Sequence, residues 1–163
     1  MFYLDLFRAL EQHKVRYLLV GGLAMNLHGV PRTTMDVDLV VALDPGNLNA
    51  FLAVVAALKL RPVAPVNLND MLDPVQRQKW LKEKNMLVIA LRPPEIQGPT
   101  VDILIEPPVD IEAALARKVW RDVQGVRIPL ISVEDLIHLK EKSGRAQDLS
   151  DIDHLRRLAG KTL

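Results

Sequence analysis

The chain has 163 residues, 49% of them hydrophobic and 25% charged, with a net charge of +1 at pH 7. These values fit one globular domain with a sizeable core. The small net charge does not indicate nucleic-acid binding, but it is compatible with a local basic patch. The absence of cysteine excludes a disulfide framework, a thiol nucleophile and a cysteine zinc site. Residues 1–10 lack a signal-peptide pattern and no stretch is apolar enough to cross a membrane, so we expect a cytoplasmic protein without a membrane partner.

The chain is predicted to begin with a helix followed by a strand. Apolar residues recur every three or four positions over 2–10, which indicates an amphipathic helix. Residues 17–20 form an apolar strand that ends at Gly21 and Gly22. Glycine accepts positive φ and lets the backbone approach a ligand closely. A short helix over 23–28 would then direct its N-terminal N–H groups at an anion such as phosphate.

Two aspartates stand one residue apart in the next apolar run. Side chains i and i+2 of a strand share a face, so Asp36 and Asp38 would project together while Val37 and Leu39 face the core. Adjacent carboxylates repel and raise each other's pKa, and a cation between them would keep both ionised. Mg²⁺ takes oxygen ligands, commonly one or two carboxylates plus substrate phosphates. Glycines and aspartates together predict a nucleotide–metal site.

Arg32 and Thr33 form the approach to these aspartates. An arginine here would hold a phosphate in a bidentate fork, or it would be a solvated loop charge, and both alternatives stay open. His28 is expected to be a packed or capping histidine.

The middle of the chain is predicted to form helices and a strand that support the site. A low-charge helix is expected over 48–60, a loop over 61–73, and a helix over 75–83 with Asp73 as its N-cap. This last helix is either a lid over the site or an ordinary surface helix. A strand is expected over 86–91.

Asp102 is the only charge inside the strand predicted over 100–105. A lone aspartate in a buried, β-branched run needs an ion-pair partner or a metal. Alternatively, its carboxylate accepts bonds from backbone N–H groups at the start of the strand.

The remaining residues predict a helix over 109–116, a hairpin over 117–130, and two helices. The hairpin carries basic residues and Trp120, and it is either a charged sheet edge or a contact for a polynucleotide. Ser132 caps the first of the two helices, residues 143–145 interrupt it, and the last helix runs over 147–158. Asp148 there has either a functional or a helix-capping role.

The spacing apolar-Gly-Gly, thirteen residues, Asp-apolar-Asp-apolar resembles the signature of the DNA polymerase β-like nucleotidyltransferase superfamily. Within it, four segments resemble the AbiEii-type and minimal nucleotidyltransferases, many of which are the toxin half of a bacterial toxin–antitoxin or abortive-infection pair. The segments are Val20-Gly21-Gly22-Leu23-Ala24, His28-Gly29, Arg32-Thr33-Thr34 and Asp36-Val37-Asp38-Leu39. The family commonly has Gly-Ser where this chain has Gly21-Gly22, so a hydroxyl that could contact phosphate is missing. The C-terminal segment around Leu139-Lys140, Gly144-Arg145, Asp148-Leu149 and Asp151-Ile152 is also similar to AbiEii-type proteins.

The resemblance implies a site and a reaction. Two Mg²⁺ ions would be held by three catalytic carboxylates, the third of which acts as general base on an incoming hydroxyl; these are Asp36, Asp38 and Asp102. The substrate, a nucleoside triphosphate (NTP), would contact Gly21, Gly22, Arg32, Thr33, Lys140 and Asp148. Arg145 and Asp151 would only tie the two C-terminal helices together.

We therefore expect a single α/β (α+β) nucleotidyltransferase domain over 1–163, with a mixed, twisted sheet flanked by helices. Its core motifs would lie in 17–105 and a helical part in 132–160. The expected reaction moves a nucleoside monophosphate (NMP) from an NTP to a hydroxyl of a tRNA end or a protein, with an antitoxin as a partner. Two alternatives stay open: a catalytically weak nucleotide-binding module, and a small-molecule transferase of the aminoglycoside type.

Overall fold

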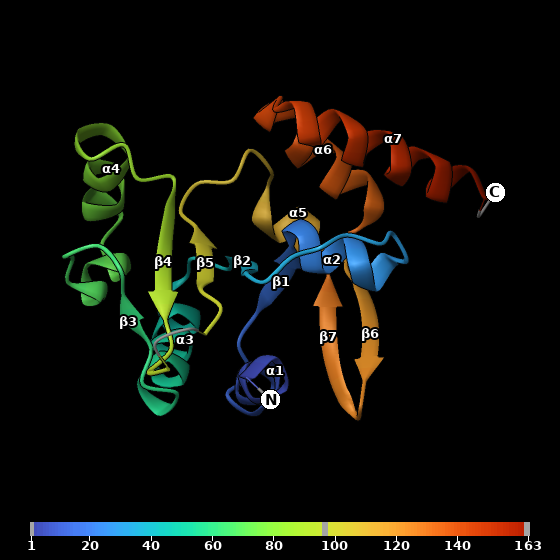
Figure 1. Cartoon of the computed structure of the whole chain (residues 1–163). Coiled ribbons are helices and arrows are strands. Elements are labelled where there is room, and N and C mark those ends of the chain that lie inside the picture. Colours follow the sequence, from blue (N-terminus) through green and yellow to red (C-terminus); the bar gives the residue numbers. More distant parts are fainter. Residues whose placement is uncertain (1, 96–97, 162–163) are drawn as a thin grey trace.

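The structure is a computed structural model that describes residues 2–95 and 98–161. Its strands are β1 (Tyr17–Val20), β2 (Val37–Val41), β3 (Arg61–Pro62), β4 (Val88–Arg92), β5 (Val101–Leu104), β6 (Val119–Val123) and β7 (Val126–Leu130). Within the described residues they form one seven-stranded sheet in the order β3-β4-β5-β2-β1-β7-β6 (Figure 1). β2 pairs with β5 and β1 with β7 in parallel, whereas the other neighbours are antiparallel. The predicted mixed sheet is confirmed.

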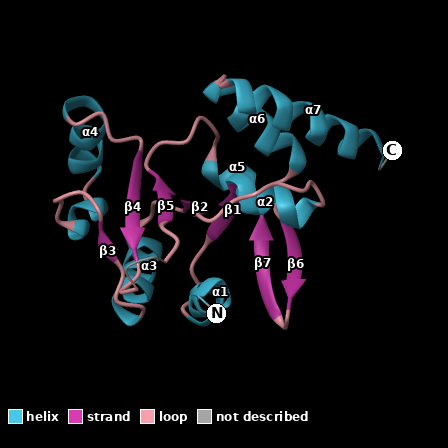
Figure 2. Cartoon of the chain, viewed as in Figure 1, coloured by secondary structure: helices cyan, strands magenta, loops and turns pink. Residues whose placement is uncertain are grey.

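Helices surround this sheet (Figure 2). They are α1 (Phe2–Gln12), α2 (Gly21–His28), α3 (Pro45–Ala57), the 3-10 helix η1 (Leu68–Leu72), α4 (Pro74–Glu83), α5 (Ile111–Ala116), α6 (Val133–Ser143) and α7 (Ala146–Lys161). In Figures 1 and 2, α4 lies beside β3 and β4, whereas the α6–α7 pair lies above β1 and β7. No helix in the described part of the chain is long and apolar enough to cross a membrane.

Local sequence signals set many of the helix ends. The side chain of Asp73 accepts a hydrogen bond from the N–H of Val75, and that of Ser132 accepts one from Asp135. Both predicted N-caps are thus confirmed, and each satisfies an N–H that the helix leaves unpaired. Gly29 ends α2 with φ of 102°, a left-handed conformation that glycine adopts without strain.

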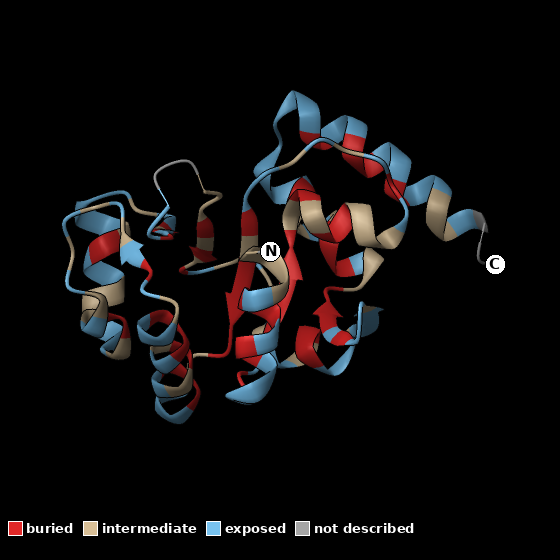
Figure 3. Ribbon diagram, turned by 60° about the horizontal axis from the view of Figure 1, so that its bottom comes forward, coloured by how far each residue is buried: buried red, intermediate tan, exposed pale blue. Residues whose placement is uncertain are grey.

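The core is built on the two central strands. All four residues of β1 are buried, and in β2 only Asp38 is not fully buried. Figure 3 shows the buried residues concentrated along the strands, with the helices exposing their outer sides. On α1 the apolar positions Leu6, Phe7 and Leu10 are the buried ones, as their spacing predicts.

Three expected boundaries were wrong. α2 begins at Gly21, so the two glycines form its first turn and do not precede it. β2 begins at Val37, which leaves Asp36 one residue before the strand. The expected loop over 61–73 contains β3 and η1, because a strand of two residues depends on its pairing with β4 and has no periodic pattern of its own.

Candidate functional site

A cleft of about 610 Å³ opens beside the ends of β1, β2 and β5 and is closed on its other side by α6 and the start of α7. Its walls bring together five of the residues singled out from the sequence: Gly21, Asp38, Asp102, Lys140 and Asp148. These residues are up to 127 positions apart in the chain, as from Gly21 to Asp148. The fold therefore gathers the N-terminal glycine and aspartate motifs and the C-terminal lysine and aspartate around one cavity.

Strand pairing places the central carboxylates. In the antiparallel β1–β2 pair Asp38 lies opposite Val20, and in the parallel β2–β5 pair it lies opposite Asp102. Paired residues point to the same face of a sheet, so the two carboxylates are neighbours on the face that borders the cleft. This juxtaposition agrees with what the family resemblance implied for Asp102, whereas its isolated charge had left a backbone role open as well.

Asp38 also lies directly against the first turn of α2. Gly21 has φ of 73°, and a Cβ atom at this residue would come within 2.1 Å of Oδ2 of Asp38. A side chain at position 21 would thus be strained by its backbone and would displace the carboxylate. At Gly22 a Cβ atom would meet the side chain of Thr34 at 3.0 Å. Because residue 21 is a glycine, the Asp38 carboxylate can lie directly against the N-terminus of α2.

The charge of Asp38 is only partly compensated. Its pKa is raised from 3.8 to about 6, mainly by burial and also by the neighbouring charges of Asp102 and Asp36. The positive charges of Lys140 and Arg32 act in the opposite sense but do not cancel the effect. Near neutral pH the ionised form of Asp38 is therefore held at a cost in free energy.

Thr100 links the two other aspartates. Its backbone N–H donates to Oδ1 of Asp36 at 3.2 Å, and its hydroxyl donates to Oδ1 of Asp102 at 3.0 Å. Burial raises the pKa of Asp102, and the bond from Thr100 opposes this shift. The sequence interpretation missed this threonine. Its position two residues before Asp102, on the same face of a strand, was the available signal.

The donor set of the three aspartates fits a hard cation, since it consists of carboxylate oxygens alone. Thr100 occupies one oxygen each of Asp36 and Asp102, and the second oxygen of each carboxylate has no hydrogen bond among the described residues. As they stand, no three His, Cys, Asp or Glu side chains in the described ranges are close enough to hold an ion. A shared metal on Asp36, Asp38 and Asp102 therefore remains a prediction.

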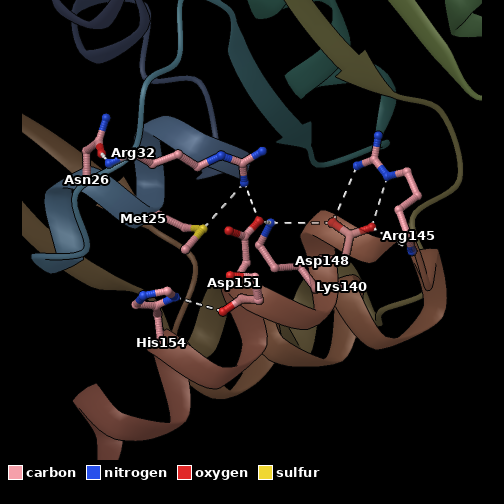
Figure 4. Close-up of polar contacts among 9 residues, drawn as sticks. Met25, Asn26, Arg32, Lys140, Arg145, Asp148, Asp151 and His154 are labelled. Atoms are coloured by element: carbon pink, nitrogen blue, oxygen red, sulfur yellow. Dashed lines mark hydrogen bonds and ion pairs between the residues drawn. The ribbon is translucent and has the colours of Figure 1, made fainter.

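A cluster of charges from α6 and α7 forms the opposite wall (Figure 4). Nζ of Lys140 lies 2.9 Å from Oδ2 of Asp151 and 3.7 Å from Oδ1 of Asp148. Nε of Arg145 donates to Oδ2 of Asp148 at 2.9 Å. Although burial acts to raise the pKa of Asp148, hydrogen bonds from Arg145 and Ser143 hold it below its usual value. Asp148 and Asp151 thus both pair with cations of this cluster.

Arg32 joins this cluster from the loop between α2 and β2. Its guanidinium forms an ion pair with Asp151 and donates to Sδ of Met25 at 3.7 Å, and its backbone N–H donates to Oδ1 of Asn26 at 2.8 Å (Figure 4). Arg32 is therefore not a solvated loop charge, and a contact of its guanidinium with phosphate stays a prediction. Thr33 lies exposed in the same loop.

Two other residues singled out from the sequence lie outside the cleft lining. Nε2 of His28 is 2.7 Å from the carbonyl oxygen of Ile131, and burial lowers the pKa of this histidine, as suits a packed side chain. Trp120 lies on β6, the last strand of the sheet. The charged groups of Arg127 and Lys118 lie 4.2 and 5.5 Å from its ring centroid.

Comparisons with known proteins agree on the fold. No curated protein sequence matches the chain. Among solved structures, the antigenic nucleotidyltransferase-like protein of Paracoccidioides brasiliensis is 19% identical with a TM-score of 0.58, over 94% of this chain and 72% of that one. The lincosamide antibiotic adenylyltransferase LnuA, bound to lincomycin, is 16% identical with a TM-score of 0.57, over 91% and 90%. ANT(2″)-Ia in complex with adenylyl-2″-tobramycin is 14% identical with a TM-score of 0.53, over 97% and 85%.

A family model covers nearly the whole chain. The model described as nucleotidyl transferase AbiEii toxin, type IV toxin–antitoxin system, matches residues 4–162. This range includes every residue that lines the cleft. The chain therefore belongs to the AbiEii family and is a nucleotidyltransferase.

Proposed function

We propose that this protein moves an NMP from an NTP to a hydroxyl group of its acceptor and that it depends on Mg²⁺. The observation that carries the proposal is the in-register pair of Asp38 and Asp102 beside Gly21, in a cleft whose opposite wall bears Lys140 and Arg145. Carboxylates that face cations across a cavity of this size suit a metal–triphosphate substrate.

The charges of the site support a role for a divalent cation. Six carboxylates gather here against four cations, Arg32, Lys140, Lys142 and Arg145, so the site carries a formal net charge of −2 before any substrate arrives. The carboxylates are those of Asp36, Asp38, Asp102, Glu106, Asp148 and Asp151. A triphosphate alone would be repelled by this charge, whereas one divalent ion would neutralise it.

The chain's own residues would divide the work as follows. Asp36, Asp38 and Asp102 would hold Mg²⁺, which when bound neutralises phosphate charge and lowers the pKa of a coordinated hydroxyl. The N–H groups of the first turn of α2, at Gly21 and Gly22, would contact the phosphates. Lys140 would add positive charge from the opposite wall, and Asp102 would accept the proton of the attacking hydroxyl.

We propose a tRNA end or a protein side chain as the acceptor, and an antitoxin protein as a partner. The support is the family's description as the toxin of a type IV toxin–antitoxin system.

A small-molecule acceptor is the second candidate. The observation that favours it is Glu106, a further carboxylate on the cleft lining whose contact to Nε2 of Gln78 is long, at 3.4 Å. An acidic wall would attract a polycationic acceptor. LnuA bound to lincomycin and ANT(2″)-Ia in complex with adenylyl-2″-tobramycin share this fold.

The test is transfer of label from each of the four α-³²P-NTPs, with and without Mg²⁺, to purified tRNA, to lysate proteins and to a panel of aminoglycosides. We expect Mg²⁺-dependent label in one acceptor class, reduced at least about 100-fold in Asp102→Asn, a loss typical of a general base. Asp153→Asn serves as the matched control because Asp153 is an exposed aspartate that pairs only with Arg157 among the described residues. Full transfer by Asp102→Asn would contradict the assigned role of this carboxylate.

A further inference from the structure

We propose that Asp151 is a positioning residue that fixes Lys140 and Arg32 at the nucleotide site and thereby couples α7 to the loop that carries the catalytic aspartates. The inference rests on the proposed function. Asp151 would affect NTP binding through Lys140 and Arg32, without contacting the substrate itself. It replaces the expectation that Asp151 only ties α6 to α7.

The geometry places Asp151 between two cations from distant parts of the chain. Its Oδ2 accepts a hydrogen bond from Nζ of Lys140 at 2.9 Å, and the same oxygen is paired with the guanidinium of Arg32 (Figure 4). Lys140 comes from α6, whereas Arg32 lies 119 residues before Asp151 in the sequence. Arg32 is also four positions before Asp36. One carboxylate oxygen thus joins the helical part to the loop that leads into β2.

Burial makes this link strong. The side chain of Asp151 is 9% exposed and that of Lys140 is 8% exposed. Nε of Arg32 is buried and has no hydrogen-bond partner in the described residues, so the pair with Asp151 is the main anchor of this guanidinium. Buried charges interact through a medium that screens them poorly, and removal of one partner leaves the others uncompensated.

The comparison with Asp148 shows why Asp151 has the coupling role. Asp148 pairs with Arg145 at 2.9 Å and with Lys140 at 3.7 Å, so both of its cations lie on α6 or in the turn before α7. Asp151 also pairs with Lys140, but its second cation is Arg32, in the loop that leads into β2. Without its charge, Lys140 and Arg32 would be drawn to Asp38 and Asp148, away from the phosphates and onto a carboxylate needed for metal.

A double-mutant cycle tests the coupling in the enzymatic reaction. In Asp151→Asn we expect the KM for the NTP to rise about tenfold or more, with a change in kcat below about fivefold. In a Lys140→Met background the same substitution should raise KM by clearly less than in wild type, because the part of the effect that Asp151 exerts through the lysine is already lost. Asp151→Glu should recover part of the loss, whereas Asp153→Asn should behave as wild type. Additive effects of the two substitutions on KM would overturn the proposal.

A second measurement does not depend on catalysis. In amide hydrogen exchange, Asp151→Asn should accelerate exchange in the Arg32 loop over 30–36 and leave the β3–β4 pair, at the other end of the sheet order, unchanged. Equal exchange of the loop in wild type and variant would also overturn the proposal. If the wild type binds no NTP at all, the proposed function fails, and the exchange result still decides whether Asp151 couples the two elements.

Discussion

The two walls of the cleft use the same residue type in opposite electrostatic states. On the sheet side, burial and mutual repulsion raise the pKa of Asp38 and of Asp102. On the helix side, Asp148 is buried almost completely, yet hydrogen bonds hold its pKa below the usual value. The sheet aspartates therefore lack a counter-charge, whereas the helix aspartates already have theirs. In the proposed function a cation would bind to the sheet wall only, because the aspartates of the helix wall are already paired.

The largest effect on stability is expected on the paired wall. Lys140→Met leaves Asp148 and Asp151 with only their arginine partners, and loss of one member of a buried ion network costs about 3 kcal/mol or more. Urea unfolding should show this loss. Lys142→Met, at an exposed lysine of the same helix, is the control and should change stability by less than about 0.5 kcal/mol. If the two variants are equally stable, the helix-side network is not a structural frame.

On the unpaired wall the expected effect has the opposite sign and depends on pH. Because the folded state holds the Asp38 proton more tightly than the unfolded state, the metal-free protein loses stability as pH rises from about 4 to about 6. A shift to about 6 corresponds to about 3 kcal/mol, which partial exposure reduces to about 2. Asp38→Asn should therefore be more stable than wild type above about pH 7 and similar near pH 4.

Urea unfolding of metal-free protein at both pH values measures this difference, with Asp153→Asn as the control. A variant that is less stable than wild type above pH 7 would show that the ionised Asp38 carboxylate is already compensated by the protein.

A smaller effect is expected where the sheet wall meets α2. Gly21→Ala must adopt a positive φ and displace the Asp38 carboxylate, and a left-handed alanine alone costs about 1–2 kcal/mol. Gly22→Ala is the matched comparison, since its φ is not positive and its nearest contact is the Thr34 side chain at 3.0 Å. Thermal unfolding should show a lower melting temperature for Gly21→Ala than for Gly22→Ala. The reverse order would argue against the close approach of Asp38 to Gly21.

The smallest effect is expected at an exposed ion pair of the same two helices. Arg156 and Glu141 lie 2.9 Å apart, with 64% and 46% of their side chains exposed. Arg156→Ala should change stability by less than about 0.5 kcal/mol, because solvent screens such pairs. Calorimetric unfolding of Arg156→Ala and Lys140→Met would compare the stability lost at an exposed ion pair with that lost at a buried one. Equal losses in the two variants would contradict the claim that burial makes the helix-side network more stabilising.

Much of the sheet wall could be predicted from the sequence, because its signals are local. Three apolar runs each contain or end in residues that differ from their surroundings. The first ends in two glycines, the second contains the Asp-x-Asp pair, and the third contains a single aspartate. The placement of Asp36 before β2 and its bond from the N–H of Thr100 could not be predicted, since both depend on how β5 pairs with β2. Asp151 was the hardest residue to interpret, because its partner Arg32 is 119 positions away and no periodicity connects them.

The most direct test of the account is calorimetric titration of wild type and Asp38→Asn with each of the four NTPs, with and without Mg²⁺. We predict that one or more NTPs bind the wild type only with Mg²⁺, and that this binding is lost in Asp38→Asn while Asp153→Asn binds normally. Binding of equal strength without Mg²⁺, or unchanged binding in Asp38→Asn, would contradict the claim that the sheet aspartates await a cation.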